Sequence, residues 1–548
     1  MAQVLQVHPA DNVLVALVDL PAGTSVSCDG ARCVLPEAVP AKHKFVTKDL
    51  APGDPVVMYG VLVGRAARPL TRGTRLTTEN VRHDASGFGA WHGPRPWQAP
   101  DVSRWQARTF LGYHRSDGQV GTANVWLVVP LVFCENRNVE VLREAFEPVL
   151  GYARPGRYAQ LVAALANRYR QGATPDELRH LPVPPGTEAR AGRVFPNVDG
   201  IRFLTHQAGC GGTREDARAL CGLLAGYLHH PNVAGATVLS LGCQNAQVEV
   251  LREELHRRNP RFDKPLLVFE HQRYGTEEDL LTEAVRQTFV ALAEADRIER
   301  RPAPLGRLTI GVECGGSDGF SGLSANPVIG HVADLIVALG GSVILSEFPE
   351  LCGVEQELID RCVSAEVADR FRTLMRAYAA RAEAVGAGFD MNPSPGNIRD
   401  GLITDAMKSA GAARKGGTSP VVDVLDYPEY VRRPGLNLLC TPGNDVESTT
   451  AMAGAGANVI LFSTGLGTPT GNPVAPVVKV SSNTALARRM PDLIDFDAGP
   501  VITGEQTIAQ AGAALLELVI RVASGEQLTK AERLGQYDFI PWKRGVSL

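Results

Sequence analysis

The chain has 548 residues, of which 44% are hydrophobic and 21% charged, a composition typical of a globular protein with several domains. A formal net charge of −4 provides no basic surface for nucleic acid. No apolar run reaches the roughly 20 residues of a membrane helix, and residues 1–12 lack the features of a secretory signal, so we expect a cytoplasmic location without membrane partners.

The ten cysteines are expected to be reduced in that compartment, so that some of them are available as ligands. No CxxC pair occurs, which excludes zinc ribbons and thioredoxin-like redox motifs. Neither GxGxxG nor GxxxxGK[ST] is present, so the sequence gives no support to a nucleotide site.

Residues 1–85 contain short β-type runs separated by turns. The same turn pattern occurs three times, with Gly23, Gly53 and Gly73 at its centre, and predicts a compact β module with tight turns. The module also carries polar side chains that either form a solvated surface or close over a site on the rest of the chain. These side chains are His8, Asp11, Asn12, His43 and Lys44.

Residues 86–108 are rich in Gly, Pro and Trp, and the tryptophans indicate a connector that packs across a surface. From residue 109 onward, apolar β-type runs alternate with longer helical segments such as 214–229 and 327–339. This alternation predicts an α/β body with largely parallel strands and a boundary near 301–304. The predicted domains are therefore 1–85, 109–300 and 301–548, with 86–108 as linker.

Four predicted strands end at a cysteine: Cys134, Cys210, Cys243 and Cys314. Because ligands bind outside the carboxyl ends of parallel strands, these thiols are candidates to meet at one rim. The last three open polar or glycine-rich loops, which suit a polyhydroxy acid. Three thiolates can anchor an iron–sulfur cluster, or bind a single divalent metal. The alternative is that cysteine is simply a common residue of buried strands.

Several longer motifs carry a resemblance to a known family. Residues 112–124 (GYHRSDGQVGTAN), 241–245 (LGCQN), 313–327 (ECGGSDGFSGLSANP), 392–397 (NPSPGN) and 462–469 (FSTGLGTP) resemble, in this order, motifs of altronate and galactarate dehydratases. The preceding residues resemble the β-clip module, of the SAF type, found before the catalytic body in that family. The resemblance thus implies an α/β fold: a small N-terminal β-clip (SAF) module followed by a two-part α/β catalytic body with largely parallel sheets.

The resemblance also implies a reaction. Family members dehydrate an aldonic or aldaric acid to a 2-keto-3-deoxy acid, using Fe²⁺ with Mn²⁺ as an occasional substitute. Residues 435–445 and 494–499 look closer to altronate than to galactarate members, so we expect altronate as substrate. We also expect a homo-oligomer, namely a homodimer. One departure stands out: altronate members often carry His-x-His-x-His-Asn at the end of the module, where residues 75–80 here read RLTTEN.

Removing a proton next to a carboxylate requires stabilisation of an enediolate, together with a base and an acid. The residue types and the resemblance give three sets of candidates. The metal or cluster ligands are Cys210, Cys243 and Cys314; the catalytic groups are His206, His43 and Lys44; the substrate-binding groups are His8, Asp11, Asn12, Arg115, Ser317, Asp318, Asn326 and Asn397.

Other functions stay open at this point. Within enzymes, the alternatives are galactarate dehydration and loss of sulfite from sulfolactate. A second class is a non-catalytic sugar-acid binding or regulatory protein, which the altered stretch at 75–80 favours. An NAD-dependent α/β enzyme is the weakest alternative, because the chain lacks a dinucleotide fingerprint.

Overall fold

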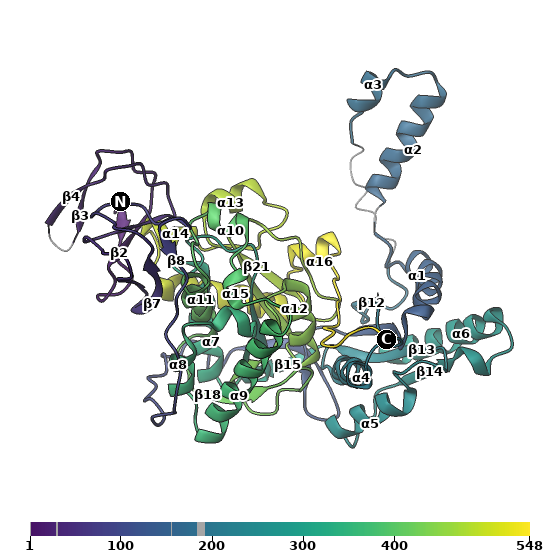
Figure 1. Cartoon of the computed structure of the whole chain (residues 1–548). Coiled ribbons are helices and arrows are strands. Elements are labelled where there is room, and N and C mark those ends of the chain that lie inside the picture. Colours follow the sequence, from purple (N-terminus) through teal and green to yellow (C-terminus); the bar gives the residue numbers. More distant parts are fainter. Residues whose placement is uncertain (1, 29–30, 155, 184–191) are drawn as a thin grey trace.

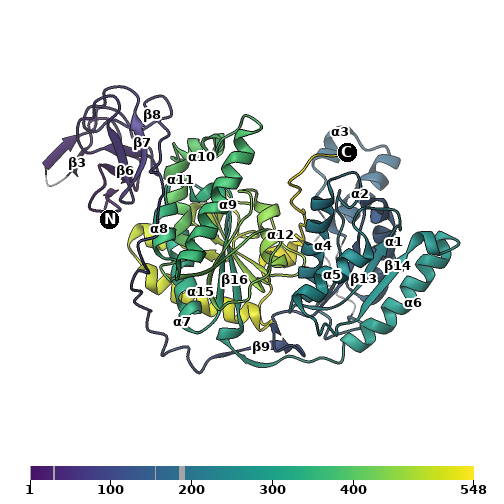
Figure 2. The same ribbon diagram turned by 60° about the horizontal axis from the view of Figure 1, so that its bottom comes forward.

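A computed structural model describes residues 2–28, 31–154, 156–183 and 192–548. The chain forms an N-terminal β module, a second part around a four-stranded sheet and a C-terminal part around a seven-stranded sheet (Figure 1). In both views the module and the second part lie on opposite sides of the C-terminal part (Figures 1 and 2). Within the described ranges, no helix combines the length and the apolar character needed to cross a membrane.

The N-terminal module consists of three small sheets, β1-β2-β5, β3-β4 and β6-β7-β8. Gly23, Gly53 and Gly73 have φ values of +82°, +90° and +88°, in the left-handed region that favours glycine, so the three predicted turns are confirmed. The strands are β1 (Val4–Leu5), β2 (Val13–Ala16), β3 (Ser25–Cys28), β4 (Ala31–Val34), β5 (Lys44–Val46), β6 (Pro55–Met58), β7 (Val61–Ala66) and β8 (Val81–Arg82).

The connector at 86–108 runs along the C-terminal part, below it in Figure 2. Its three tryptophans each donate a hydrogen bond to that surface: Trp91 to the carbonyl of Cys362, Trp97 to the Thr418 hydroxyl and Trp105 to the Glu517 carboxylate. The prediction of a packed connector is therefore confirmed.

The second part is built on parallel strands in the order β12-β11-β13-β14. Both faces of β11 are buried, since Trp126 and Leu127 enter two different apolar cores, which explains its continuous apolar sequence. The predicted boundary at 301–304 is β15, which pairs back to β9 in a small separate sheet. The elements are β9 (Thr109–His114), β10 (Val120–Gly121), β11 (Val125–Pro130), α1 (Asn136–Leu150), α2 (Arg157–Arg170), α3 (Pro175–Arg179), β12 (Gly200–Phe203), α4 (Arg214–His229), β13 (Val233–Ser240), α5 (Val248–Arg258), β14 (Leu266–Glu270), α6 (Glu277–Ala295) and β15 (Arg301–Pro304).

The C-terminal part contains seven parallel strands in the order β18-β19-β17-β16-β20-β21-β22, which confirms the predicted α/β class. Its strands are β16 (Thr309–Cys314), β17 (Ser342–Leu345), β18 (Val421–Leu425), β19 (Gly435–Leu439), β20 (Val459–Thr464), β21 (Val477–Ser481) and β22 (Phe496–Asp497). Its helices are α7 (Ala325–Ala338), α8 (Glu355–Asp360), α9 (Ala365–Glu383), α10 (Pro395–Arg399), α11 (Asp405–Ala412), α12 (Asp445–Gly454), α13 (Thr484–Arg489), α14 (Gly499–Thr503), α15 (Ile508–Ala523) and α16 (Lys530–Leu534).

The strand order of this sheet reverses beside β16, since β17 is added on one side and β20 on the other. At such a reversal the loops diverge and leave a crevice at the carboxyl ends of the strands. The N-terminal module packs next to these loops through a shared apolar core, in which Val46 and Met58 meet Phe320, Ile403 and Met407. The module therefore covers the loops that follow β16.

Candidate functional site

A buried polar cluster lies at the carboxyl ends of β16 and β17. Cys314 is the last residue of β16, Glu347 follows β17, and Glu350 lies in the 3-10 turn Phe348–Leu351. The Cys314 Sγ lies 3.2 Å from Glu350 Oε2 and 3.7 Å from Glu347 Oε2. All the candidate ligand atoms of this trio lie within 4.8 Å of one another. With Lys408 and Lys415 these residues form what we call the Cys314 cluster.

Two buried lysines partly neutralise the cluster. Lys415 Nζ donates to Glu347 Oε2 at 2.6 Å and to Cys314 Sγ at 3.0 Å, and Lys408 Nζ donates to Glu350 Oε1 at 2.5 Å. Burial opposes the charged form of both lysines, but the neighbouring thiol and carboxylates outweigh it and raise the pKa of each. Likewise, burial would raise the pKa of Glu350, yet Lys408 and Lys415 hold it below its usual value.

Two further carboxyl groups, those of Glu313 and Asp445, belong to the surroundings of the cluster. Burial, followed by Glu347, raises the pKa of Glu313 well above its usual range, and burial raises the pKa of Asp445 to about 7. The buried Oε1 atoms of Glu313 and Glu347 have no other donor within the described part of the chain, and the two carboxyl groups share a hydrogen bond with the proton on Glu313. A cation that displaced this proton would meet two carboxylates beside a thiol, a donor set that suits a divalent metal.

The backbone of Glu347 is also unusual. Its φ and ψ of 64° and 59° lie in the left-handed region, which costs a non-glycine residue about 1–3 kcal/mol. The amide of Glu347 donates to the Thr441 hydroxyl at 2.8 Å, which holds this conformation. The strain directs the Glu347 carboxylate toward Cys314 and Lys415 rather than along the strand.

A second polar surface comes from the N-terminal module, on β5. Side chains alternate along a strand, so Phe45 enters the core of the module while Lys44 and Val46 face the C-terminal part. Lys44 is fully buried and its Nζ donates to the carbonyl of Gly401 at 2.7 Å. Burial lowers the pKa of Lys44 to about 7, an effect that Lys42 increases and Asp318 opposes.

Of the two ring nitrogens of His43, one is hydrogen-bonded and the other has no described partner. Its Nε2 lies 3.1 Å from the carbonyl oxygen of Arg399, which can only accept, so Nε2 carries the hydrogen. Its Nδ1 is buried and has no partner among the residues that the structure describes. Burial lowers the pKa of His43, and the charges of Lys44 and Arg75 lower it further. His43 is therefore neutral at pH 7, with a lone pair available on Nδ1.

The loop at 315–319 connects these two polar regions. Lys42 Nζ lies 3.0 Å from Asp318 Oδ2 and 2.7 Å from Asp400 Oδ1. At the other end of the loop, a side chain on Gly315 would overlap the Asp445 carboxylate, so only glycine permits this close approach. The loop thus runs from the Cys314 cluster to the module.

Several residues predicted from the sequence lie on this loop or at its two ends. Cys314 precedes the loop, Ser317 and Asp318 belong to it, and His43 and Lys44 lie next to Lys42, which binds Asp318. Asn326 and Asn397 support the loops: Asn326 accepts from Ser463 and donates to the carbonyl of Gly411, and Asn397 donates to the carbonyl of Ser317. These two amides hold backbone and neighbouring side chains in place, and their hydrogen-bonding groups are occupied.

Other predicted substrate-binding residues stabilise their own segments instead. Asp11 accepts from the amides of His8 and Gly60, and Asn12 bridges Pro55 and Val57 within the module. The Nδ1 of His8 accepts from the amide of Ala10. Arg115 is buried in the second part, where it donates to the carbonyl of Pro231 and to Asn124.

His206 follows β12 in the second part, and the second part lies on the opposite side of the C-terminal part from the module (Figures 1 and 2). Its Nε2 lies 2.8 Å from the carbonyl oxygen of Pro130, and its Nδ1 accepts from the amide of Ala208. Burial lowers the pKa of His206. Both ring nitrogens are therefore engaged with backbone, an arrangement that fits a structural residue and leaves no free lone pair for a base.

The three cysteines predicted to act together are not brought together. Cys210 and Cys243 are exposed and follow β12 and β13 of the four-stranded sheet, whereas Cys314 is buried at the end of β16. Among described residues, the thiol of Cys314 groups with Glu347 and Glu350, and neither Cys210 nor Cys243 belongs to a set of three metal-ligand side chains. The prediction assumed one rim, but the strands belong to two sheets.

The sequence reasoning missed Glu347, Glu350, Lys408 and Lys415. Glu347 and Glu350 had a usable signal, because residues 346–350 (SEFPE) follow the apolar run 342–345 just as other polar loops follow strands. The two lysines lie in helical sequence with no such signal, and only the packing of α11 and the following turn brings them to the cluster.

Comparisons with known proteins agree along the whole chain. Residues 2–84 match the altronate/galactarate dehydratase SAF domain, residues 112–296 the second domain of D-galactarate dehydratase/altronate hydrolase, and residues 305–547 the C-terminal domain of D-galactarate/altronate dehydratase. The chain is 34% identical over 547 residues to altronate dehydratase of Escherichia coli, and 31% identical over 549 residues to that of Bacillus subtilis, covering 100% of both chains in each case. It is 29% identical to the galactarate dehydratase (L-threo-forming) of E. coli, over 97% of this chain and 95% of that one.

Proposed function

Because the chain belongs to the D-galactarate/altronate dehydratase family, we propose that it is a hydro-lyase that converts D-altronate to 2-keto-3-deoxy-D-gluconate and water. The observation that carries this proposal is the buried thiol–carboxylate–lysine cluster, from which the loop at 315–319 leads to the part of the module that bears His43 and Lys44. Higher identity to the altronate dehydratases than to the galactarate dehydratase favours altronate as substrate.

We propose Cys314, Glu347 and Glu350 as the ligands of a divalent metal, with Fe²⁺ first and Mn²⁺ as a substitute. The paired carboxyl groups of Glu313 and Glu347 support this assignment, since a bound cation would displace the proton that they share. A mixed thiol and carboxylate set favours iron over magnesium. When bound, such a metal supplies Lewis-acid stabilisation of the charge that develops on the substrate. The separation of Cys210 and Cys243 from Cys314 argues against the three-cysteine iron–sulfur cluster.

The proton transfers are assigned to the module. His43 is neutral with a free Nδ1, so it accepts the proton from the carbon next to the carboxylate. Lys44 has a pKa of about 7 and can donate a proton from Nζ to the departing hydroxyl, which leaves as water. The resulting enol then ketonises. This assignment separates base from acid, a distinction that residue types alone leave open.

The remaining residues orient these groups and exclude water. Asp318 binds Lys42 and accepts from the hydroxyls of Ser321 and Ser482, and the amide of Gly315 donates to the carbonyl of Ser463, so the loop at 315–319 is fixed at both ends. Val46, two residues after Lys44, belongs to the same apolar core as Phe320, and this core joins the module to the C-terminal part. A site closed in this way strengthens electrostatic interactions inside it. The homodimeric assembly and the cytoplasmic location stay predictions from the sequence.

The test is an assay of protein purified without oxygen and supplied with Fe²⁺. Altronate, galactarate and sulfolactate are compared by kcat/KM, with detection of 2-keto-3-deoxy acid or of sulfite. We expect turnover of altronate to be highest, with bound iron and no acid-labile sulfide. A higher kcat/KM for galactarate would show that galactarate, not altronate, is the substrate. Acid-labile sulfide found together with the iron would favour the three-cysteine iron–sulfur cluster over the single metal. Binding of the three acids without turnover of any of them would refute the enzyme proposal.

A further inference from the structure

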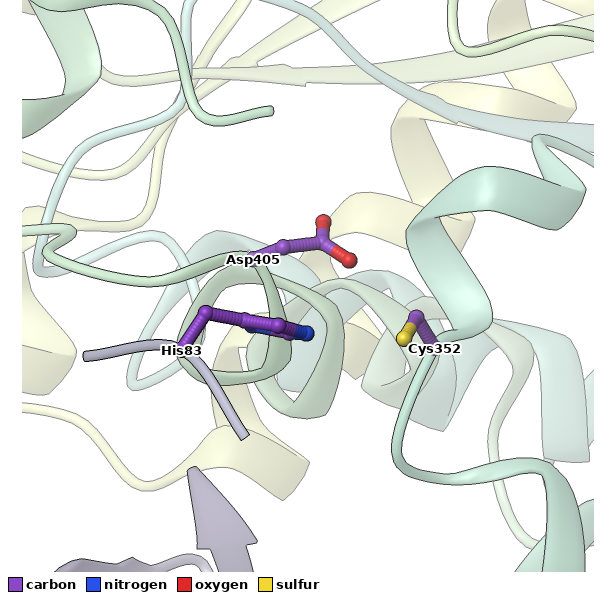
Figure 3. Close-up of side chains that lie close together, drawn as sticks. All are labelled: His83, Cys352 and Asp405. Carbon is purple, nitrogen blue, oxygen red and sulfur yellow. The ribbon is translucent and has the colours of Figure 1, made fainter. Parts of the chain in front are cut away.

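Three side chains from separate segments point toward one another at the junction between the module and the C-terminal part (Figure 3). His83 follows β8, Cys352 follows the 3-10 turn Phe348–Leu351, and Asp405 is the first residue of α11. An imidazole nitrogen, the thiol sulfur and a carboxylate oxygen all lie within 4.8 Å of one another. We call this trio the His83 site; it shares no residue with the Cys314 cluster.

Two polar atoms of the His83 site are incompletely paired. The buried Nδ1 of His83 has no hydrogen-bond partner within the described residues. Asp405 accepts from the Ser409 hydroxyl through Oδ1, and apart from the Cys352 thiol no described donor meets its buried Oδ2. Asp405 is 0% exposed, and burial, followed by the charge of Glu350, raises its pKa well above the usual range. The ionised form of a carboxyl group in such a place is costly, and a bound cation would offset that cost.

We propose that His83, Cys352 and Asp405 bind a divalent cation of the zinc type, with water as the fourth ligand. Zinc bonds of about 2.0–2.3 Å place tetrahedral ligand atoms roughly 3.5 Å apart, so small side-chain rotations close the observed spacing. Imidazole and thiolate ligands favour zinc over magnesium or calcium, which prefer oxygen. This inference does not depend on the proposed dehydratase activity.

A Cys–His–Asp set can also serve a thiol nucleophile, but this site is unsuited to that role. Reactive thiols have a lowered pKa, which they gain from nearby positive charge. Here burial, followed by Asp405 and Glu355, raises the pKa of Cys352. Without a cation the thiol stays protonated, whereas a coordinated metal would displace the proton and hold the sulfur as thiolate.

A cation at this place would tie the end of the module to the elements that form the Cys314 cluster. The backbone is tightly packed there: a side chain on Gly353 would lie 3.3 Å from the Cβ of Ala406 and 3.4 Å from that of Ala85. Cys352 lies two residues after Glu350, and Asp405 lies one helical turn before Lys408. The metal therefore has a structural role, fixing the module against both elements.

The experiment separates the two metal sites by mutation. Full-length protein is stripped with a chelator and titrated with Co²⁺, which absorbs strongly when thiolate is bound. A Cys314→Ser background removes the thiol of the other cluster. In this background we expect one equivalent of Co²⁺ with thiolate absorption, loss of that absorption on adding Cys352→Ser, and affinity weakened at least about tenfold on adding His83→Ala. The matched control adds Cys134→Ser, which alters an exposed cysteine and should change nothing.

Unchanged absorption and affinity after Cys352→Ser and His83→Ala would overturn the proposal. If circular dichroism shows that the Cys352→Ser variant does not fold, the His83→Ala variant provides the same test, because His83 is only half-buried. A second readout is alkylation of Cys352 by iodoacetamide, identified by mass spectrometry. We expect Zn²⁺ to slow it at least about tenfold; rapid alkylation at neutral pH that zinc leaves unchanged would support the nucleophile and contradict a metal site.

Discussion

Replacement of Lys44 by methionine should stabilise the folded protein near neutral pH while lowering its activity. Lys44 is fully buried, and burial lowers its pKa from 10.5 to about 7. Holding a lysine in this state has a free-energy cost, because the unfolded chain keeps the proton more tightly than the folded one. Methionine has a similar length and no charge, so Lys44→Met removes that cost.

The size of the effect follows from the two pKa values. A depressed lysine pKa destabilises the fold most at and below pH 7, and the penalty disappears as the pH rises toward 10.5. At about 1.4 kcal/mol per unit, the penalty is about 4 kcal/mol at pH 7 and about 2 kcal/mol at pH 9. The variant also leaves the carbonyl of Gly401 unpaired, which costs about 1–3 kcal/mol. The net gain is therefore about 1–3 kcal/mol at pH 7 and close to zero at pH 9.

The assay is thermal unfolding of wild type and variant at both pH values, following the transition in which the module is released. A chain with several domains need not unfold in one step, so the comparison uses the difference between the two proteins and its change with pH. Alongside, kcat/KM of the variant should fall about 10²–10⁴-fold, the usual worth of a general acid. A variant that is less stable than wild type by the same amount at both pH values would show that Lys44 is an ordinary charged lysine, and would refute the reasoning.

Four further predictions concern the same site. The kcat/KM of the wild-type enzyme should decrease as the pH rises above about 7, because Lys44 must be protonated to act as acid, and a pH profile without that limb would contradict its role. His43→Gln should lower kcat about 10²–10⁴-fold while bound iron, measured by elemental analysis, stays unchanged. Glu347→Gln and Cys314→Ser should weaken iron binding at least about tenfold, whereas Cys210→Ser and Cys243→Ser should leave it unaltered; loss of iron from the latter two would revive the three-cysteine site. Gly315→Ala should destabilise the protein by about 1–3 kcal/mol and reduce activity, since its methyl group overlaps the Asp445 carboxylate, and normal thermal unfolding would show that the loop can move aside.

The fold was largely predictable because its signals are local. Residues 214–229 form α4 as expected, with Thr213 capping the helix by accepting from the amide of Asp216. The glycine turns of the module likewise need only the residues next to them. Such features depend on backbone conformation and on the period of apolar side chains, and both can be read along the chain.

The site was less predictable because it depends on strand pairing. The runs before Cys210 and Cys243 look like the run before Cys314, yet they join a different sheet, and nothing within each segment indicates which. Lys415 reaches Glu347 across 68 residues of sequence, and Lys408 reaches Glu350 across 58. Contacts of this kind are decided by which strands lie side by side, a property of the whole sheet.

Residues 75–80, which depart from the histidine-rich pattern of the altronate members, lie next to the strand that carries Lys44. They border β5, since the amide of Leu76 donates to the carbonyl of Lys44, and the Asn80 side chain closes their turn by bonding to Thr77 and Arg75. After burial, the charge of Arg75 is among the groups that lower the pKa of His43. A histidine near this place would titrate in the same range as His43, whereas arginine carries a fixed charge that adds to burial and Lys44 in lowering the pKa of His43. The departure from the family pattern is therefore compatible with His43 acting as a base.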